Sequence, residues 1–257
     1  MRTARLARRM RDYDWAAAFI ELLIVVVGIL IALRVSNWNQ ERVDHARAQG
    51  YYRRIHADLL TDRRSIDITL AYWSKVSAYG SGAIAYGETG TLVDGSQWKT
   101  VLAWYQASQI FPFELASTTF EEMRSSGDLG LIADEKLRKE LADYYRLSGT
   151  GVQAMIMNHN PVYRKQIRGL TPWHVQEYIW SHCFRETSFA NQHLLDCPSP
   201  IGDREAAAIL ETYRQSPTLL DHLRTWMSTL RVSEIILDNT RTTAARLAVE
   251  VAAAEKQ

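Results

Sequence analysis

One apolar run near the start of the chain limits what this sequence can be. The stretch FIELLIVVVGILIALRVSNWN covers residues 19–39, and the segment from Trp15 to Leu33 is 19 residues long. As a helix it would extend about 28 Å at roughly 1.5 Å per residue. That length nearly equals the roughly 30 Å hydrocarbon core of a bilayer, so residues 15–33 are predicted to be a transmembrane helix.

The flanks of this segment favour an anchor that is retained in the mature protein. Trp15 and Trp38 would occupy the two membrane interfaces, where amphipathic rings are favoured. A cleaved signal peptide is the main rival, but its apolar region is usually shorter, about 7–15 residues, and a small-x-small site follows it. Here the run leads into Leu33-Arg34-Val35-Ser36, a poor cleavage site. A buried helix of a soluble protein is the third reading.

The arginines predict an orientation. Five precede the span, at positions 2, 5, 8, 9 and 11, whereas Arg34, Arg42 and Arg47 follow it and are partly offset by Glu41 and Asp44. Positive loops tend to stay in the cytoplasm. Residues 1–14 are therefore expected to form a basic cytoplasmic tail, with the remainder of the chain exported. The net charge of +1 argues against a nucleic-acid partner.

Glu21 is a carboxylate inside an otherwise apolar segment. It could be protonated or reach the headgroups, because charges near the ends of a span cost less than the 2.5–3.5 kcal/mol or so at its centre. Its spacing also suggests a second role, on one helix face with small residues that allow close helix packing. That face consists of Ala18, Glu21, Val25, Gly28 and Ala32. We expect it to join copies of the chain or a partner helix.

Beyond the span, apolar residues recur with helical spacing and no series of strands is apparent. The predicted fold class is all-α: a juxtamembrane helix at 34–87 that ends in the glycines at 80, 82, 87 and 90, a helical head at 88–215, and a long C-terminal helix at 216–257. Gly127 is expected to end one helix of the head and Asp134 to cap the next. The two long helices either pair antiparallel as a stalk or wrap into a compact bundle.

Two blocks of sequence resemble a family of uncharacterised bacterial membrane proteins, known as a domain of unknown function. The first is the span with Glu21, its Gly-Ile-Leu-Ile-Ala centre at 28–32 and the Asn37-Trp38-Asn39 exit. The second runs from Thr119-Phe120-Glu121 through Ser125-Ser126-Gly127 to the paired tyrosines at 144 and 145. The resemblance implies an inner-membrane anchor and a helical extramembrane part, but no reaction, ligand or cofactor.

Cys183 and Cys197 are the only cysteines and are separated by thirteen residues. In an exported domain we expect a disulfide, which for a loop of about fifteen residues is worth roughly 3 kcal/mol. A zinc site with His182 and His193 is the alternative, although the spacing matches no zinc motif.

Function is therefore predicted from topology. The sequence contains no phosphate-binding loop, dinucleotide fingerprint, nucleophile elbow or HExxH motif, so we expect no enzyme and no cofactor. The first hypothesis is a membrane-anchored scaffold or partner-binding protein with a periplasmic domain, associated as a homo-oligomer or with a partner membrane protein. A sensor subunit that signals through a partner and an oligomeric pore lined by Glu21 are the alternatives.

Overall fold

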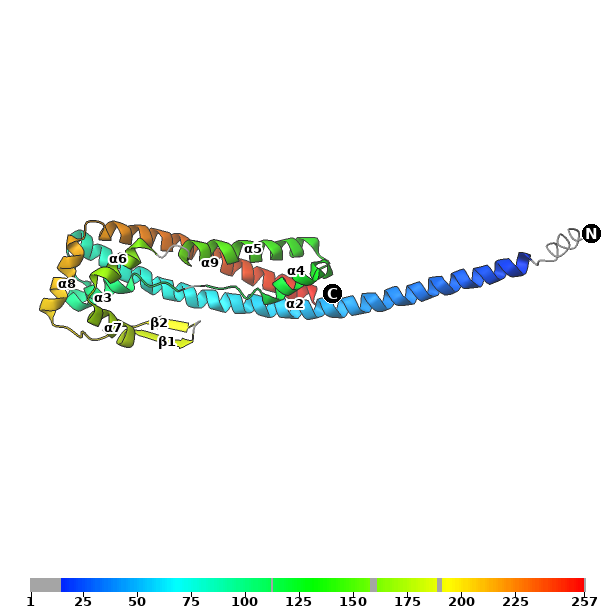
Figure 1. Cartoon of the computed structure of the whole chain (residues 1–257), viewed down its shortest axis with the longest axis horizontal. Coiled ribbons are helices and arrows are strands. Elements are labelled where there is room, and N and C mark those ends of the chain that lie inside the picture. The colour runs from blue at the N-terminus through cyan, green and yellow to red at the C-terminus, as the bar shows by residue number, and fades with distance from the viewer. Residues whose placement is uncertain (1–14, 112, 158–160, 189–190, 257) are drawn as a thin grey trace, which may run out of the picture. The chain divides into compact units, whose positions relative to one another are not determined.

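The computed structural model describes residues 15–111, 113–157, 161–188 and 191–256. The chain divides into two compact units, residues 1–50 and 51–257. Figure 1 shows the order of the elements along the chain. The first element, α2 (Trp15–Thr89), is a single helix of 75 residues that contributes to both units.

The second unit is organised by the pairing of α2 with α9 (Leu219–Ala254). Four polar pairs fix the direction: Arg53–Glu255, Asp67–Arg241, Ser77–Glu234 and Glu88–Arg224. Residue numbers rise on one helix as they fall on the other, so the pair is antiparallel, and Figure 1 shows α9 running alongside the cyan part of α2. Of the two arrangements considered for the long helices, this unit has the antiparallel one.

The glycines of α2 do not end the helix where the sequence predicted. Gly80, Gly82 and Gly87 lie inside it, and the helix ends only at Thr89. Gly90 then adopts a φ of +78°, and its N–H donates to Tyr86 O at 2.8 Å. A Cβ built on Gly80 would lie 2.0 Å from Met227 Sδ, so this glycine allows α9 to approach closely.

The remaining elements lie between the two long helices in sequence. In chain order they are η1 (Val93–Gly95), α3 (Gln97–Gln106), α4 (Thr118–Ser126), η2 (Asp128–Leu131), α5 (Glu135–Met157), α6 (Val162–Leu170), α7 (Trp173–His182), β1 (Phe184–Ser188), β2 (Asn191–Leu194) and α8 (Asp203–Gln215). Two predicted helix ends are confirmed. Gly127 takes a φ of +79° after α4, and Asp134 Oδ1 accepts the N–H groups of Lys136 and Leu137 at the start of α5.

Aromatic side chains form much of the core of the second unit, and three of them donate hydrogen bonds to backbone carbonyls. Trp73 Nε1 donates to Phe111 O at 3.1 Å, and Trp226 Nε1 donates to Ala107 O at 2.8 Å. Tyr163 Oη donates to Trp104 O at 2.5 Å. Such pairing matters because a buried polar group without a partner costs about 1–3 kcal/mol.

The all-α prediction is wrong in one place, where an antiparallel hairpin replaces the expected loop. β1 pairs with β2, with Phe184 opposite Leu194 and Arg185 opposite His193. The strands are short and mostly polar, so they lack the alternation of apolar and polar residues that marks a half-buried strand. The described chain is therefore mostly helical, with one two-stranded sheet.

Candidate membrane-association site

The N-terminal part of α2 carries a long apolar surface that nothing in the described structure covers. An 18-residue window has a mean hydropathy of 2.7, and none of it is buried. Phe19 and Ile24 are 64% and 63% exposed. Within the described residues, this is the one helix long and apolar enough to cross a membrane. A continuous apolar surface of this size marks an interaction site rather than an ordinary water-facing helix.

The five residues of the predicted association face occupy a narrow strip of this helix. At 3.6 residues per turn, positions 18, 21, 25, 28 and 32 fall within about 80° of the circumference. Glu21, Val25, Gly28 and Ala32 are exposed, and Ala18 is half-buried. A Cβ on Gly28 would meet no atom within 4 Å, so another helix could approach its backbone there. Association through this face stays a prediction.

The two predicted interfacial anchors differ in what can be described. Trp38 is 65% exposed, and the guanidinium of Arg42 lies 5.9 Å from the centroid of its ring. Arg42 Nη2 also donates to Asn39 Oδ1 at 3.4 Å. This grouping of an indole, an arginine and an amide suits the polar edge of a bilayer. Trp15 is the first residue of α2, but its side chain lies outside the described part.

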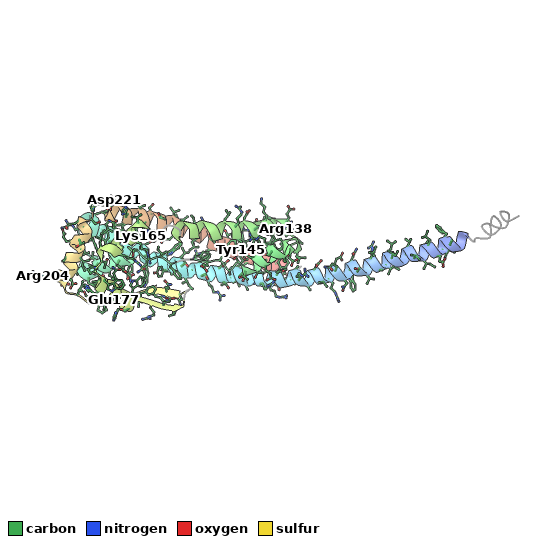
Figure 2. The ribbon with its side chains drawn as sticks, viewed as in Figure 1. Arg138, Tyr145, Lys165, Glu177, Arg204 and Asp221 are labelled. Atoms are coloured by element: carbon green, nitrogen blue, oxygen red, sulfur yellow. A yellow bond between two sulfur atoms is a disulfide. The ribbon has the colours of Figure 1, made fainter. Side chains whose placement is uncertain are left out.

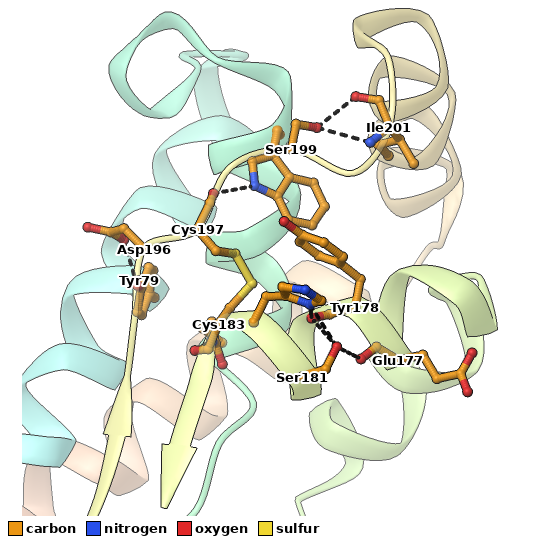
Figure 3. The surroundings of a disulfide bond; sticks show 12 residues. Tyr79, Glu177, Tyr178, Ser181, Cys183, Asp196, Cys197, Ser199 and Ile201 are labelled. Carbon is orange, nitrogen blue, oxygen red and sulfur yellow. Dashed lines mark hydrogen bonds between the residues drawn. A yellow bond between two sulfur atoms is a disulfide. The ribbon is translucent and has the colours of Figure 1, made fainter.

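Cys183 and Cys197 form a disulfide, with their Cα atoms 5.2 Å apart. Figure 3 shows that it joins the residue before β1 to the segment after β2. Two hydrogen bonds connect it to α3: Trp98 Nε1 donates to Cys197 O at 2.9 Å, and Gln106 Nε2 donates to Cys183 O at 3.0 Å. The disulfide therefore closes the base of the hairpin, and the two hydrogen bonds attach it to α3.

The disulfide leaves neither sulfur as a ligand for the zinc site that was the alternative. His182, one of its suggested ligands, stacks on Tyr178 with ring centroids 4.2 Å apart, and its Nδ1 lies 2.8 Å from Ser181 Oγ. His193, the other, lies on β2 opposite Arg185. No group of three or more histidine, cysteine, aspartate or glutamate side chains suited to a metal occurs among the described residues.

Sequence reasoning missed a buried carboxylate at Asp62, which is 1% exposed. Its Oδ1 accepts the N–H of Ala116 at 2.7 Å, and its Oδ2 accepts the hydroxyl of Tyr144 at 2.8 Å. Burial raises the pKa of Asp62 to about 6, against the lowering effect of these hydrogen bonds. The signal was present, because Asp62 falls on the apolar stripe of α2 between Leu59 and Ile66, both fully buried.

Two further polar atoms belong to the surroundings of Asp62. Tyr145 Oη and Asp58 Oδ2 are buried without a hydrogen-bond partner in the described structure. Tyr145, labelled in Figure 2, stacks on Phe120 with centroids 4.6 Å apart. These residues belong to α2, α4 and α5, so the cluster connects these three helices.

Comparisons with protein-family models, with curated proteins and with solved structures found no match. The resemblance to a family of membrane proteins therefore stays a prediction based on the two sequence blocks.

Proposed function

We propose that this chain is a single-span membrane protein, with its N-terminus in the cytoplasm and its second unit outside. The observation that carries the proposal is the apolar part of α2, which has a mean hydropathy of 2.7 and no buried residue in that window. Exposing such a surface to water would be unfavourable by about 25 cal/mol per Å². A bilayer removes that cost, and the arginine excess before residue 15 favours the stated orientation.

The disulfide supports an extracytoplasmic place for the second unit. Disulfides persist in oxidising compartments and are rare where thiol reductants are abundant. Cys183 is fully buried, and the disulfide joins it to Cys197 at a sequence separation of 14. These features suit a structural bond in an exported domain, in a bacterial cell the periplasm.

We propose that the exported unit is a scaffold or a partner-binding module rather than an enzyme. Asp62, a buried carboxylate whose pKa is raised, receives hydrogen bonds from Ala116 and Tyr144 and so connects elements of the fold. Its partner is expected to be a second copy or another membrane protein, met through the strip at positions 18, 21, 25, 28 and 32.

Single cysteines introduced along α2, in a background with Cys183 and Cys197 replaced by alanine, test the association. Oxidation in native membranes should crosslink copies bearing cysteine at 21, 25, 28 or 32. Cysteine at 20, 23, 27 or 30, on the opposite side of the helix, is the control. A flat profile would contradict association through this face.

Orientation is tested separately, with cells that are intact or permeabilised. Protease added outside the inner membrane should degrade residues 51–257, and the chain should sediment with membranes at full length. Recovery of a soluble form that lacks residues 1–36, as a cleaved signal peptide would give, would reject the anchor.

A pore is the second candidate, and Glu21 favours it. Its carboxylate is exposed on the same strip as the small residues, so association would bring several copies of it together. Single-channel currents in the wild type, with an ion selectivity that changes in the Glu21→Gln variant, would support a pore. Equal bilayer conductance with and without the purified protein would contradict the pore and leave the membrane anchor as the proposed function.

A further inference from the structure

Two arginines one turn apart on α6 are held by neutral groups. Arg164 Nη1 donates to Ser108 O at 2.6 Å and approaches Gln109 Oε1 at 3.4 Å. Arg168 Nη2 donates to the same Gln109 Oε1 at 3.3 Å. Both side chains are half-buried, and α6 contains no acidic residue.

Several exposed arginines of the same unit have a carboxylate partner. Arg54 pairs with Glu122 at 2.6 Å, and Arg224 pairs with Glu88 at 2.6 Å. Within the described chain, neither Arg164 nor Arg168 forms an ion pair. Arg168 is the charged side chain that acts on Arg164, and the other side chains acting on the two arginines are Tyr72 and Tyr105, which are uncharged at neutral pH. The arrangement is the reverse of what stability alone favours, because an unpaired charge costs more as its burial increases.

The electrostatic consequence is a concentrated positive charge. Burial, and then the neighbouring Arg168, lowers the pKa of Arg164 to about 10, so both guanidiniums are charged at neutral pH. Burial likewise lowers the pKa of Arg168. Two adjacent positive charges without a counter-charge would attract an anion and gain from its binding.

Aromatic rings fix the position of this pair. The guanidinium of Arg168 lies over the rings of Tyr105 and Trp180, 5.6 and 5.2 Å from their centroids. The ring of Tyr105 is itself held, since its hydroxyl donates to Gln176 Oε1 at 3.3 Å. Arg168 Nε is buried and has no hydrogen-bond partner in the described structure. The guanidinium is therefore oriented in advance by these rings.

We propose that Arg164 and Arg168 form a binding site for a compact, doubly charged oxyanion, namely phosphate, sulfate or a phosphate monoester. Two fixed positive charges match a dianion, and guanidinium groups bind such oxygens through paired N–H···O bonds. A singly charged anion would leave one charge uncompensated. The site belongs to the second unit and does not depend on the proposed membrane function.

The full-length protein in detergent, titrated with sodium phosphate and sodium sulfate by calorimetry at constant ionic strength, tests the proposal. Wild type should bind both saturably, and formate much more weakly. Arg168→Met keeps the length of the side chain but removes the charge, and should weaken phosphate binding about tenfold or more. Lys165→Met, the same change at the exposed neighbour on α6 marked in Figure 2, should alter it less than about twofold.

Arg168→Lys covers the case in which Arg168→Met does not fold. It keeps the charge and loses the planar fork, so phosphate affinity should fall several-fold while the far-ultraviolet circular dichroism is unchanged. Absence of saturable binding to wild type, or an equal loss in Lys165→Met and Arg168→Met, would overturn the proposal.

Discussion

Asp62 is the residue whose ionisation is most directly connected to folding. In the folded chain its pKa is about 6, whereas the ordinary value is 3.8. Between these values the folded state retains a proton that the unfolded state has released. The free energy of unfolding should therefore fall as the pH rises from about 4 to 6, and this contribution should stay constant above that interval.

Asp62→Asn should remove that dependence, because the amide does not ionise. We expect the free energy of unfolding of wild type to fall by up to about 3 kcal/mol more than that of the variant over this interval. Urea unfolding at a series of pH values measures it. Asp67→Asn, at an exposed carboxylate of the same helix that pairs with Arg241, is the control and should keep the wild-type slope. Identical slopes for wild type and Asp62→Asn would contradict the assignment.

The two cysteines give a second prediction at this scale. Replacing both with alanine should lower the free energy of unfolding by about 3 kcal/mol, since the bond closes a loop with a sequence separation of 14. Reductant should destabilise wild type by a similar amount and leave the double variant unchanged. A double variant that remains sensitive to reductant would show that the effect comes from elsewhere.

At the scale of elements, the packing of α2 against α9 depends on the close approach of the two helices at Gly80. A glycine inside a helix costs about 1 kcal/mol relative to alanine, so its presence needs a compensating gain. Here the gain is contact with Met227, which occupies the place a Cβ would take. Local sequence predicts helix ends at the glycines of α2, because it does not contain this tertiary contact.

Gly80→Leu should separate the two helices locally and destabilise the second unit by about 1–3 kcal/mol. Gly169→Leu is the matched control, since a Cβ at that position in α6 meets nothing within 4 Å. It should be neutral or stabilising by up to about 1 kcal/mol. Chemical unfolding of both variants gives the comparison, and equal effects would refute the close-approach explanation.

Helical periodicity and caps were readable from the sequence, whereas contacts between distant segments were not. Asp134 and Gly127 act through neighbours three or four residues away, so local pattern suffices for them. The hairpin depends on Cys183 and Cys197 being held against α3, which no local pattern reports. The arginine pair left a weak trace: two arginines four residues apart, with no acid one turn from either.

For the whole molecule, the second unit has a core of its own. Its buried residues come from all of the described α-helices, α2 to α9, and the disulfide lies within it. A fragment of residues 51–257, exported to an oxidising compartment, should therefore be soluble, helical and cooperative in unfolding. Circular dichroism and thermal melts measure this. A fragment that aggregates or melts without a transition would mean that residues 1–50 are needed for folding.

The antiparallel return of α9 brings Glu255 within 3.9 Å of Arg53. The chain therefore enters the second unit and reaches residue 255 at the same end of that unit. The opposite end lies some 50 Å away, along the 36 residues of α9. A fluorescent protein fused after residue 257 would report from the end at which the chain enters and leave the distal loops unobstructed.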